Sequence, residues 1–439
     1  MVDKGLQTQG YYHGLLPRED IKEMLHKPGE FLVRTSEPVK GQPRQFILSA
    51  VGQGQNEPNH FVIRQAANNK VFVDQRGFDT ILELVNHYVA TKEPLFAQKR
   101  EVKVVIKNPV DRQKWELMHE DVELTKKLGE GAFGEVWMGK LLKVKNAAGQ
   151  PVAIAVKTAK LESMNKEQIK EIMREARLMR NLDHVNVVKF YGVAAGQEPL
   201  YVIMELADGG ALDSALKKQK YPMVTKYEMI LQSAMGLAYC HEQGLMHRDV
   251  AARNCLYGDG QVKIADFGLS RPGDHYVTDM KKKVPIRWLP PETINGGVYT
   301  MKTDVWAFGI MAWEITEDGK EPYPGMKVIE VAMQVVRDYR MTFNSEVNAE
   351  FAKFILTRCW PGKPEMRATM KEVVKWLKTF VKSQGGDPGK SGMMMKMIGK
   401  KFGKKSNSRE KMSRSSAMST ANSSVSTEAT AVSNAATAT

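Results

Sequence analysis

The sequence predicts an α+β protein with a small first domain, a larger second domain of two lobes and a disordered C-terminal tail. Helical and strand patterns around one sheet fill the first hundred or so residues. The next segment, from Asp121 to Val381, begins with strands and becomes helical, and its size of about 260 residues favours two lobes over one core. After Gln384 the large apolar residues give way to Gly, Lys and Met and then to Ser, Ala and Thr, which indicates disorder.

The small domain is expected to hold a helix on each side of a central antiparallel sheet. Pro17 marks a helix start, and Ile21, Met24 and Leu25 follow at helical spacing. The same spacing recurs over residues 81–88. The intervening strand candidates are apolar triplets bounded by turn residues, namely Phe31-Leu32-Val33, Phe46-Ile47-Leu48 and Phe61-Val62-Ile63.

The polar stretch between the domains is expected to be a short linker. It passes through Asn108-Pro109, holds Trp115 and ends near Asp121. Within the larger domain, apolar periodicity predicts helices over 226–241 and 326–337.

Charge and cysteine content limit the classes of function. The net charge is +14, but residues 384–439 carry nine basic and three acidic residues, so the folded part is only moderately basic. No nucleic-acid recognition motif accompanies this charge, so no nucleic-acid partner is expected. Three scattered cysteines fit a reducing compartment, and the sequence shows neither a signal peptide nor a membrane span. We therefore expect a cytoplasmic protein.

A glycine-rich turn lies between two apolar segments at residues 128–136. Glycines let backbone N–H groups approach phosphates closely, although a tight hairpin needs glycine as well, so the motif alone leaves both interpretations open. The apolar strand 152–156 ends at Lys157, which could reach nucleotide phosphates or lie at the surface. On the next helical segment, Glu175 flanks an apolar stripe and could pair with Lys157 or face solvent.

Polar residues with complementary chemistry follow further along the chain. Asp249 can accept the proton of a hydroxyl substrate, and Asn254, five residues later, can hold a divalent cation beside it. Asp266-Phe267-Gly268 supplies a second oxygen ligand in Asp266, and Pro290-Pro291-Glu292 closes the following loop.

The ordered set of these motifs resembles a protein kinase domain over residues 121–381, with a linker at 101–120. Ala251, Ala252 and Arg253 and the segment 284–288 are similar to tyrosine kinases, so the resemblance implies transfer of phosphate from ATP, with Mg²⁺ or Mn²⁺, to protein tyrosines. Pro290 replaces the usual alanine, and Glu292 is expected to pair with Arg367. The resemblance assigns catalysis to Asp249, Arg253, Asn254, Lys157 and Glu175, the metal to Asn254 and Asp266, and ATP binding to Leu128, Gly129, Gly131, Gly134, Val136, Ala155, Lys157, Met204, Glu205 and Ala207.

The same resemblance places an autophosphorylation tyrosine at Tyr276. Phosphate there would add about −1.5 to −2 charge and could bind Arg248, which would order the loop. An ordinary exposed loop tyrosine is the alternative.

The motifs Tyr11-Tyr12-His13-Gly14 and 31–36 together resemble an SH2 domain over residues 11–100. Arg34 ends an apolar strand, and a buried guanidinium needs an anionic partner, which a phosphotyrosine would supply. The resemblance adds Arg18, Ser36 and His60 to this pocket; pairing of Arg34 with an internal carboxylate is the alternative. Tyr11 replaces the usual tryptophan, and Pro38 stands where a hydroxyl residue often binds phosphate.

Residues 114–122 resemble the Fes/Fer type of non-receptor tyrosine kinase, here in a form that lacks the N-terminal membrane-binding region. The expected partners are phosphotyrosine proteins and protein tyrosine substrates. A catalytically weak phosphotyrosine-binding scaffold is the alternative function. Contact with an anionic membrane through the basic tail competes with a merely solvated tail. The tail residues concerned are Lys396, Lys400, Lys401, Lys404 and Lys405, interleaved with Met393, Met394, Met395, Ile398 and Phe402.

Overall fold

The computed structural model describes residues 4–389 except for 38–41, 97–102, 132–133, 160–165 and 279–283. The tail that was predicted to be disordered begins at residue 384, and its part from residue 390 onward, which includes the residues of the predicted membrane contact, lies outside this description.

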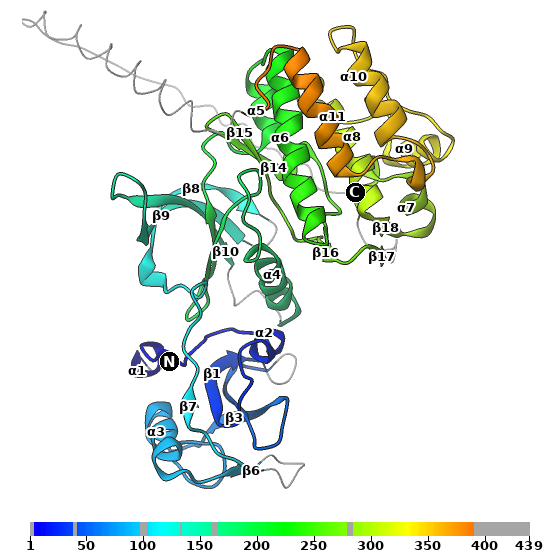
Figure 1. Ribbon diagram of the computed structural model, residues 1–439. Coiled ribbons are helices and arrows are strands. Elements are labelled where there is room, and N and C mark those ends of the chain that lie inside the picture. The colour runs from blue at the N-terminus through cyan, green and yellow to red at the C-terminus, as the bar shows by residue number, and fades with distance from the viewer. Residues whose placement is uncertain are drawn as a thin grey trace, which may run out of the picture. The chain divides into compact units, whose positions relative to one another are not determined.

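The small domain is built on one sheet with the strand order β4-β3-β2-β1-β7 (Figure 1). Strand β2 pairs antiparallel with both β1 and β3, and each of these three strands contains one of the predicted apolar triplets. The strands are β1 (Glu30–Ser36), β2 (Gln45–Val51), β3 (Pro58–Gln65), β4 (Val71–Phe72) and β7 (Asn108–Pro109), with β5 (Leu95–Phe96) and β6 (Lys103–Val104) forming a separate pair.

Apolar residues cover both faces of this sheet, as the alternation along β1 requires. Leu32 packs in one cluster with Ile21, beside α2 (Arg18–Lys22). Phe31 and Val33 belong to a second cluster with Tyr88 of α3 (Ile81–Thr91). The prediction of a sheet between two helices is therefore confirmed. A short helix, α1 (Lys4–Gln7), precedes these elements.

Two details differ from the sequence prediction. Helix α2 ends at Lys22, so Met24 and Leu25 lie in the following turn, where the Glu30 carboxylate accepts bonds from the backbone N–H groups of His26 and Lys27. Asn108 and Pro109, expected in a plain linker, form β7 and pair in parallel with β1. Proline tolerates this place because an edge strand leaves one row of N–H groups unused.

The upper lobe of the larger domain is a five-stranded sheet with the order β11-β12-β10-β9-β8 and one helix, α4 (Lys166–Met179), which contacts β11. Ile169, Ile172, Met173, Ala176 and Met179 form the predicted buried stripe of α4. The strands are β8 (Val122–Gly131), β9 (Gly134–Lys145), β10 (Pro151–Ala159), β11 (Phe190–Ala194) and β12 (Leu200–Glu205), and the short helix η1 (His119–Asp121) precedes them.

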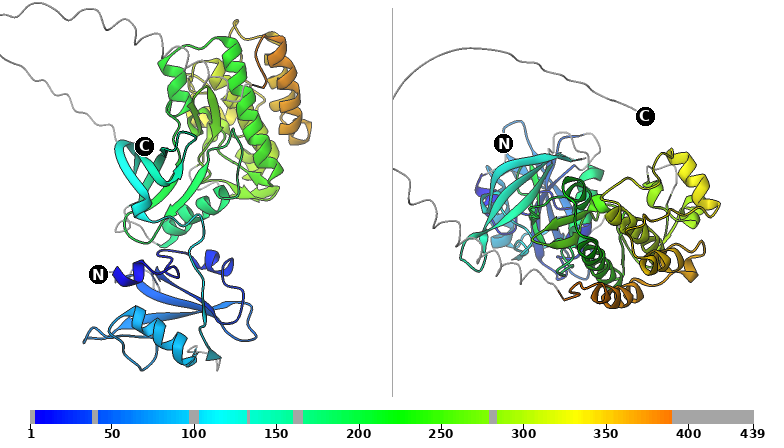
Figure 2. Two further views of the ribbon diagram at one scale, coloured as in Figure 1. Left: turned by 60° about the vertical axis from the view of Figure 1, so that its left-hand side comes forward. Right: turned by 90° about the horizontal axis from the view of Figure 1, so that it is seen from above.

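The lower lobe is mainly helical. Helices α6 and α11 lie side by side, in green and orange in Figures 1 and 2. The predicted helices at 226–241 and 326–337 are confirmed as α6 (Met223–Glu242) and α9 (Val328–Val336). The other helices are α5 (Leu212–Lys218), α7 (Pro291–Gly296), α8 (Met301–Thr316), α10 (Ala349–Phe354) and α11 (Met370–Ser383).

Three short strand pairs lie between the main helices of the lower lobe in the sequence. They are β13 (Leu245–Met246) with β16 (Arg271–Pro272), β14 (Cys255–Gly258) with β15 (Gln261–Ile264), and β17 (His275–Val277) with β18 (Val298–Thr300). Single helical turns occupy η3 (Ala252–Asn254), η4 (Ile286–Trp288), η5 (Ile355–Cys359) and η6 (Pro364–Met366).

Helix α8 is the centre of the lower lobe. Every residue from Thr303 to Thr316 is buried, which matches a helix that is apolar on nearly all sides. Two carboxylates, Asp304 and Glu314, interrupt this apolar run. Buried charges need partners, so these residues are expected to organise polar segments around them.

Candidate active site

The glycine-rich turn joins β8 to β9. Gly129 lies opposite Val136, and Gly131 lies opposite Gly134. A Cβ on Gly134 would lie 1.9 Å from the carbonyl oxygen of Thr158, so only glycine fits there. Gly134 is thereby held close to β10, and Val136 of β9 lies opposite Lys157 of β10. Leu128, Gly129 and Gly131 lie on β8, on the other side of β9.

Lys157 and Glu175 approach each other from β10 and α4. The Lys157 Nζ lies 3.6 Å from a carboxylate oxygen of Glu175. Burial raises the pKa of Glu175, Lys157 opposes this rise, and the Asp266 carboxylate adds to it. The structure therefore brings together Lys157, Glu175 and Asp266, which the sequence singled out. Of these, Lys157 can contact phosphate oxygens.

The connection between the lobes follows β12. Met204 is buried and lies opposite Ala155 of β10, so the two side chains border the same space. The Glu205 carboxylate accepts a bond from the Lys189 backbone N–H at 2.6 Å and lies 3.1 Å from the Lys263 Nζ. Because its side chain is engaged there, Glu205 would contact a nucleotide through its backbone, as would Ala207.

Asp249 lies in a loop with Arg253 and Asn254. Arg253 donates to the Asp249 carboxylate, and the Asn254 amide nitrogen donates to the Asp249 carbonyl oxygen at 2.8 Å. Burial raises the pKa of Asp249, and the positive charge of Arg253 counteracts this effect. Arg253 thus holds the carboxylate of Asp249, and Asn254 holds its backbone.

Asp304, which the sequence analysis did not single out, anchors this loop from α8. Its carboxylate accepts bonds from the backbone N–H groups of His247 and Arg248, each at 2.8 Å, and from His241 Nε2 at 2.9 Å. These bonds hold Arg248 at a φ of 70°, which non-glycine residues rarely adopt. The signal available in the sequence was a carboxylate inside an apolar helical stretch.

Asn254 and Asp266 supply oxygen ligands from neighbouring segments. The Ala265 N–H donates to the Asn254 carbonyl oxygen at 2.9 Å, which places the next residue, Asp266, beside Asn254. Since the Asn254 amide nitrogen is bonded to Asp249, its amide oxygen is the atom available to a cation. Amide and carboxylate oxygens suit a hard divalent cation, so this donor pair fits the expected metal.

Trp288 forms an aromatic platform beside the loop. The Arg253 guanidinium lies 4.1 Å from the centre of the Trp288 ring. Glu314 of α8, also missed from sequence, accepts bonds from the Trp288 indole N–H at 3.0 Å and the Ala252 N–H at 3.1 Å. One buried carboxylate thus joins the loop of Asp249 to the platform.

Two predicted contacts of the following loop can be checked directly. Glu292 and Arg367 form a two-pronged ion pair with distances of 2.7 and 2.8 Å, which confirms that prediction. The Arg248 guanidinium lies 4.1 Å from the ring centre of Tyr276. The tyrosine is therefore already beside the arginine that was expected to bind its phosphate.

The pocket of the small domain centres on Arg34. Its guanidinium is buried and donates to the Ser49 hydroxyl at 3.4 Å and the Leu16 carbonyl at 3.3 Å. The Ser49 hydroxyl also bonds to His60 Nδ1 at 2.9 Å. Ser36 lies two residues after Arg34 on β1, on the same face of the sheet. Ser49 was not predicted, because its role depends on strand pairing.

Electrostatics in this pocket favour an anion. Burial lowers the pKa of Arg34 to about 10, and the nearby Arg18 lowers it as well. Burial, Arg34 and Arg18 together lower the pKa of His60 to about 3, so His60 stays neutral at physiological pH. Among the described residues, Arg34 forms no ion pair with a carboxylate, which argues against the internal partner considered above.

The two-lobed fold and these side chains define a protein kinase that is joined to an SH2 domain. Comparisons with known families agree: residues 122–377 match the family described as protein tyrosine and serine/threonine kinase, and residues 11–88 match the SH2 domain.

Individual relatives narrow the class. Fer-related kinase 1 of Caenorhabditis elegans is 38% identical over 387 residues, which cover 87% of this chain and 96% of that protein. The human tyrosine-protein kinase Fer is 39% identical over 386 residues, 87% of this chain but 45% of its own length. The transforming protein Fps of avian sarcoma virus (strain PRCII) is 34% identical over 378 residues, 85% of this chain and 68% of its own.

The chain belongs to the Fer/Fps family of non-receptor protein tyrosine kinases. It is an ATP-dependent enzyme that uses a divalent metal, acts on proteins and binds phosphotyrosine proteins through its SH2 domain. The predicted class and the tyrosine kinase activity are confirmed, and the scaffold alternative is not supported. No helix within the described residues has the length and apolar character to cross a bilayer.

Proposed function

We propose that this enzyme transfers the γ-phosphoryl group of ATP to tyrosines of proteins that its SH2 domain has selected, with Asp249 as the proton acceptor. The observation that carries this proposal is the position of Arg253, which binds the Asp249 carboxylate and stacks on Trp288. An aromatic platform beside the carboxylate suits a flat phenol ring, whose hydroxyl group would then face Asp249.

The remaining residues bind and orient the nucleotide. Lys157, held by Glu175, would contact the phosphates, and the glycine-rich turn would cover them with its backbone N–H groups. Asn254 and Asp266 would hold Mg²⁺, with Mn²⁺ as the alternative. When bound, this cation offsets the negative charge of the phosphates. The adenine would lie between Val136, Ala155 and the backbone of residues 205–207.

The decisive experiment incubates the purified chain with ATP and Mg²⁺ or Mn²⁺ and with matched tyrosine and serine peptides. Tyrosine phosphorylation is expected to fall by at least about 10³-fold in Asp249→Asn, because the amide cannot accept the proton. Asp259→Asn, which changes an exposed aspartate outside the site, is the matched control. Equal activity of the two variants would refute the assignment of Asp249.

The SH2 domain is proposed to recruit the enzyme through Arg34, Arg18, Ser36 and His60. A phosphate in this pocket would bind the Arg34 guanidinium, whose hydrogen-bond partners in the described residues are all neutral. Docking next to a phosphotyrosine raises the effective concentration of nearby substrate tyrosines. We propose that the enzyme acts in the cytoplasm. The positive charge of the basic tail supports a second proposal, peripheral attachment to an anionic membrane.

Contacts between the SH2 domain and α4 support a second role for this domain. Arg177 of α4 binds the Asp20 carboxylate of α2 through two hydrogen bonds of 3.0 and 2.7 Å. Trp115 lies under the Arg180 guanidinium at 4.8 Å. Since α4 carries Glu175, we propose that SH2 docking holds this helix in the position that catalysis needs.

Tyr276 is the proposed autophosphorylation site. Its hydroxyl would lose a proton and gain the γ-phosphoryl group of ATP, with ADP as the leaving group. The added charge of about −1.5 to −2 would then face Arg248.

A further inference from the structure

Helix α9 exposes apolar side chains to solvent. Ile329, Met333 and Val336 are 74%, 49% and 41% exposed. Their spacing of four and three residues places them on one face of the helix, and we call these three residues the α9 stripe. Val331 and Val335 are buried and hold α9 on the lower lobe. The helix is therefore apolar on its outer face as well as on its inner face.

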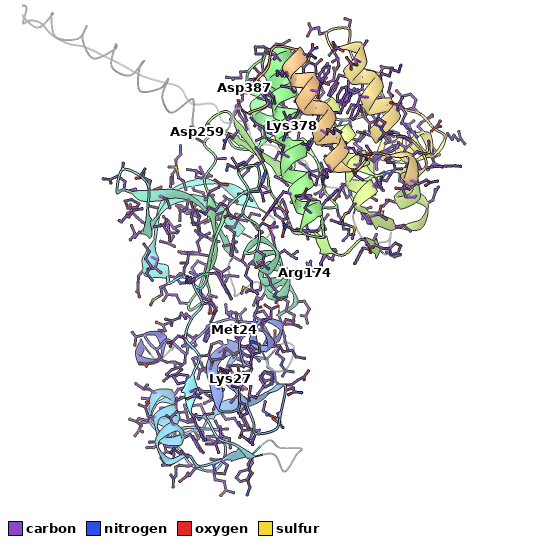
Figure 3. All side chains as sticks on the ribbon, in the orientation of Figure 1. Met24, Lys27, Arg174, Asp259, Lys378 and Asp387 are labelled. Atoms are coloured by element: carbon purple, nitrogen blue, oxygen red, sulfur yellow. The ribbon has the colours of Figure 1, made fainter. Side chains whose placement is uncertain are left out.

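The outer face of α11 has the composition that is usual for a surface helix. Its exposed residues are all polar or charged, and Figure 3 labels one of them, Lys378. Single exposed apolar side chains are common, but a row of three on one helix face is typical of a surface that binds another protein. Met333, the middle residue of the α9 stripe, suits this role because its flexible side chain adapts to the shape of a partner.

The α9 stripe has a fixed position relative to the active site. Helix α9 contacts η4, the turn that carries Trp288. The Arg287 guanidinium of η4 donates to the carbonyl oxygens of Pro322 at 2.9 Å and Met326 at 2.8 Å, in the segment that leads into α9. A protein whose tyrosine lies on Trp288 would therefore find the α9 stripe at a defined position.

The loop that carries Tyr276 belongs to the same part of the lower lobe. Tyr276 lies on β17, which pairs with β18, and helix α7 contacts both β18 and α9. Figure 1 shows α7, α9, β17 and β18 grouped at one end of the lobe. One copy of the chain thus carries the proposed substrate tyrosine, the aromatic platform and the α9 stripe on neighbouring elements.

The size of the α9 stripe indicates a transient contact. A stable dimer buries about 800 Å² on each partner, whereas three partly exposed side chains offer about 300 Å². The stripe is therefore too small to hold a dimer alone. It can prolong an encounter in which the active site holds the same partner, because the second contact then forms at a high effective concentration.

We propose that the α9 stripe docks a second copy of this chain while the active site phosphorylates Tyr276 of that copy. The two copies would present the same stripe to each other in a two-fold contact, so that apolar side chains cover apolar side chains. In the transfer, the Tyr276 oxygen of the second copy bonds to the γ-phosphorus of ATP, ADP leaves, and Asp249 of the enzyme copy accepts the phenol proton. The inference rests on the proposed autophosphorylation of Tyr276 and adds the surface that selects the folded chain.

The test measures phosphorylation of Tyr276 between two full-length chains. The substrate copy carries Asp249→Asn and a heavy-isotope label, so that mass spectrometry distinguishes it from the enzyme copy. We define the docking ratio as kcat/KM for this protein divided by kcat/KM for the free peptide of residues 269–284, which contains the same tyrosine.

The double variant Ile329→Gln with Met333→Gln removes the apolar surface and introduces a residue that favours helices. Placed in both copies, it is expected to lower the docking ratio about fivefold, mainly through a higher KM for the protein. Since the two stripes face each other, the substitutions in one copy alone should already produce most of this loss. Val185→Gln changes another exposed apolar residue, in the loop between α4 and β11, and should keep the wild-type docking ratio.

Three results would overturn the proposal. A wild-type docking ratio in the double variant, with Tyr276 phosphorylated, would refute the docking role of the α9 stripe alone. A wild-type chain that sediments as a stable dimer at micromolar concentration, and as a monomer in the double variant, would show a permanent interface in place of a transient one. Absence of phosphate on Tyr276 with the wild-type enzyme copy would refute the proposed autophosphorylation and the inference with it. If the double variant fails to fold, Ile329→Gln alone tests the same surface and must lower the docking ratio about twofold.

Discussion

Glu314 shows how one residue can link two parts of an active site. It is 4% exposed, yet it receives hydrogen bonds from Ala252 in the loop of Asp249 and from the platform residue Trp288. Burial raises the pKa of Glu314 to about 7, although the two hydrogen bonds and the charge of Arg253 oppose this rise. The carboxylate therefore titrates within the physiological range.

This titration predicts a change in stability with pH. Between the ordinary Glu value of 4.5 and about 7, the folded protein keeps a proton on Glu314 that the unfolded chain releases. Stability from this group is therefore greatest at low pH and falls as pH rises through the window, by about 3 kcal/mol in total. Glu314→Gln keeps an acceptor for both hydrogen bonds and cannot ionise, so its free energy of unfolding should lack this loss.

Urea unfolding followed by tryptophan fluorescence at pH 5 and pH 8 measures the effect as the difference between wild type and Glu314→Gln. Glu346→Gln, an exposed substitution, should follow the wild type. An identical pH dependence in Glu314→Gln and wild type would show that Glu314 is ionised throughout.

At the scale of secondary structure elements, helix α4 of the kinase domain contacts the SH2 domain. Its residue Arg177 pairs with Asp20, whose side chain is 2% exposed, whereas the pair Lys22–Glu57 within the SH2 domain has exposed fractions of 55% and 74%. Removal of one partner from a buried pair leaves an uncompensated charge, but exposed pairs contribute little.

A double-mutant cycle should separate the two cases. For Asp20→Asn with Arg177→Met, a coupling free energy of about 2 kcal/mol is expected in thermal or urea unfolding, against less than about 0.5 kcal/mol for Lys22→Met with Glu57→Gln. If α4 depends on this contact, Arg177→Met should also lower kcat on a short peptide, while the Lys22 and Glu57 variants should not. Equal coupling free energies in both cycles would show that the ion pair between the domains stabilises the fold no more than an exposed pair does.

The sequence predicted these elements unevenly. Local signals sufficed for α6, α9 and the three main SH2 strands, because apolar periodicity is a property of neighbouring residues. Helix α2 was predicted too long, since the bonds from Glu30 that follow it are not visible in periodicity. Strand β7 was missed because two residues give no pattern, and its pairing depends on β1, about 80 residues earlier in the chain.

The same distinction applies to the active site. Asp249, Asn254 and Asp266 belong to short motifs with fixed spacing, so they could be named from the sequence. Asp304 and Glu314 act on segments 57 and 62 residues away in the chain, and no local motif marks them. Their roles follow only from tertiary packing, which brings a charged side chain on a helix close to polar groups of a distant loop.

At the scale of the whole molecule, the enzyme combines a phosphotyrosine pocket with a site that is proposed to make phosphotyrosine. This combination predicts a preference for substrates that are already phosphorylated nearby, because docking raises the local concentration of the second tyrosine. The measured quantity is the ratio of kcat/KM for a peptide with a priming phosphotyrosine to kcat/KM for the same peptide without it. For the wild type this ratio is expected to be at least about ten, carried mainly by a lower KM for the primed peptide.

Arg34→Leu should bring that ratio close to one, because it removes the buried guanidinium that would bind the priming phosphate. The folded SH2 domain should tolerate this change, since Arg34 has no carboxylate partner in the described residues and a shorter apolar side chain replaces a buried charge. Arg337→Leu, an exposed substitution in the lower lobe, is the matched control and should keep the wild-type ratio. A ratio in Arg34→Leu equal to that of the wild type would mean that the preference arises in the kinase domain and that SH2 docking does not select the substrate.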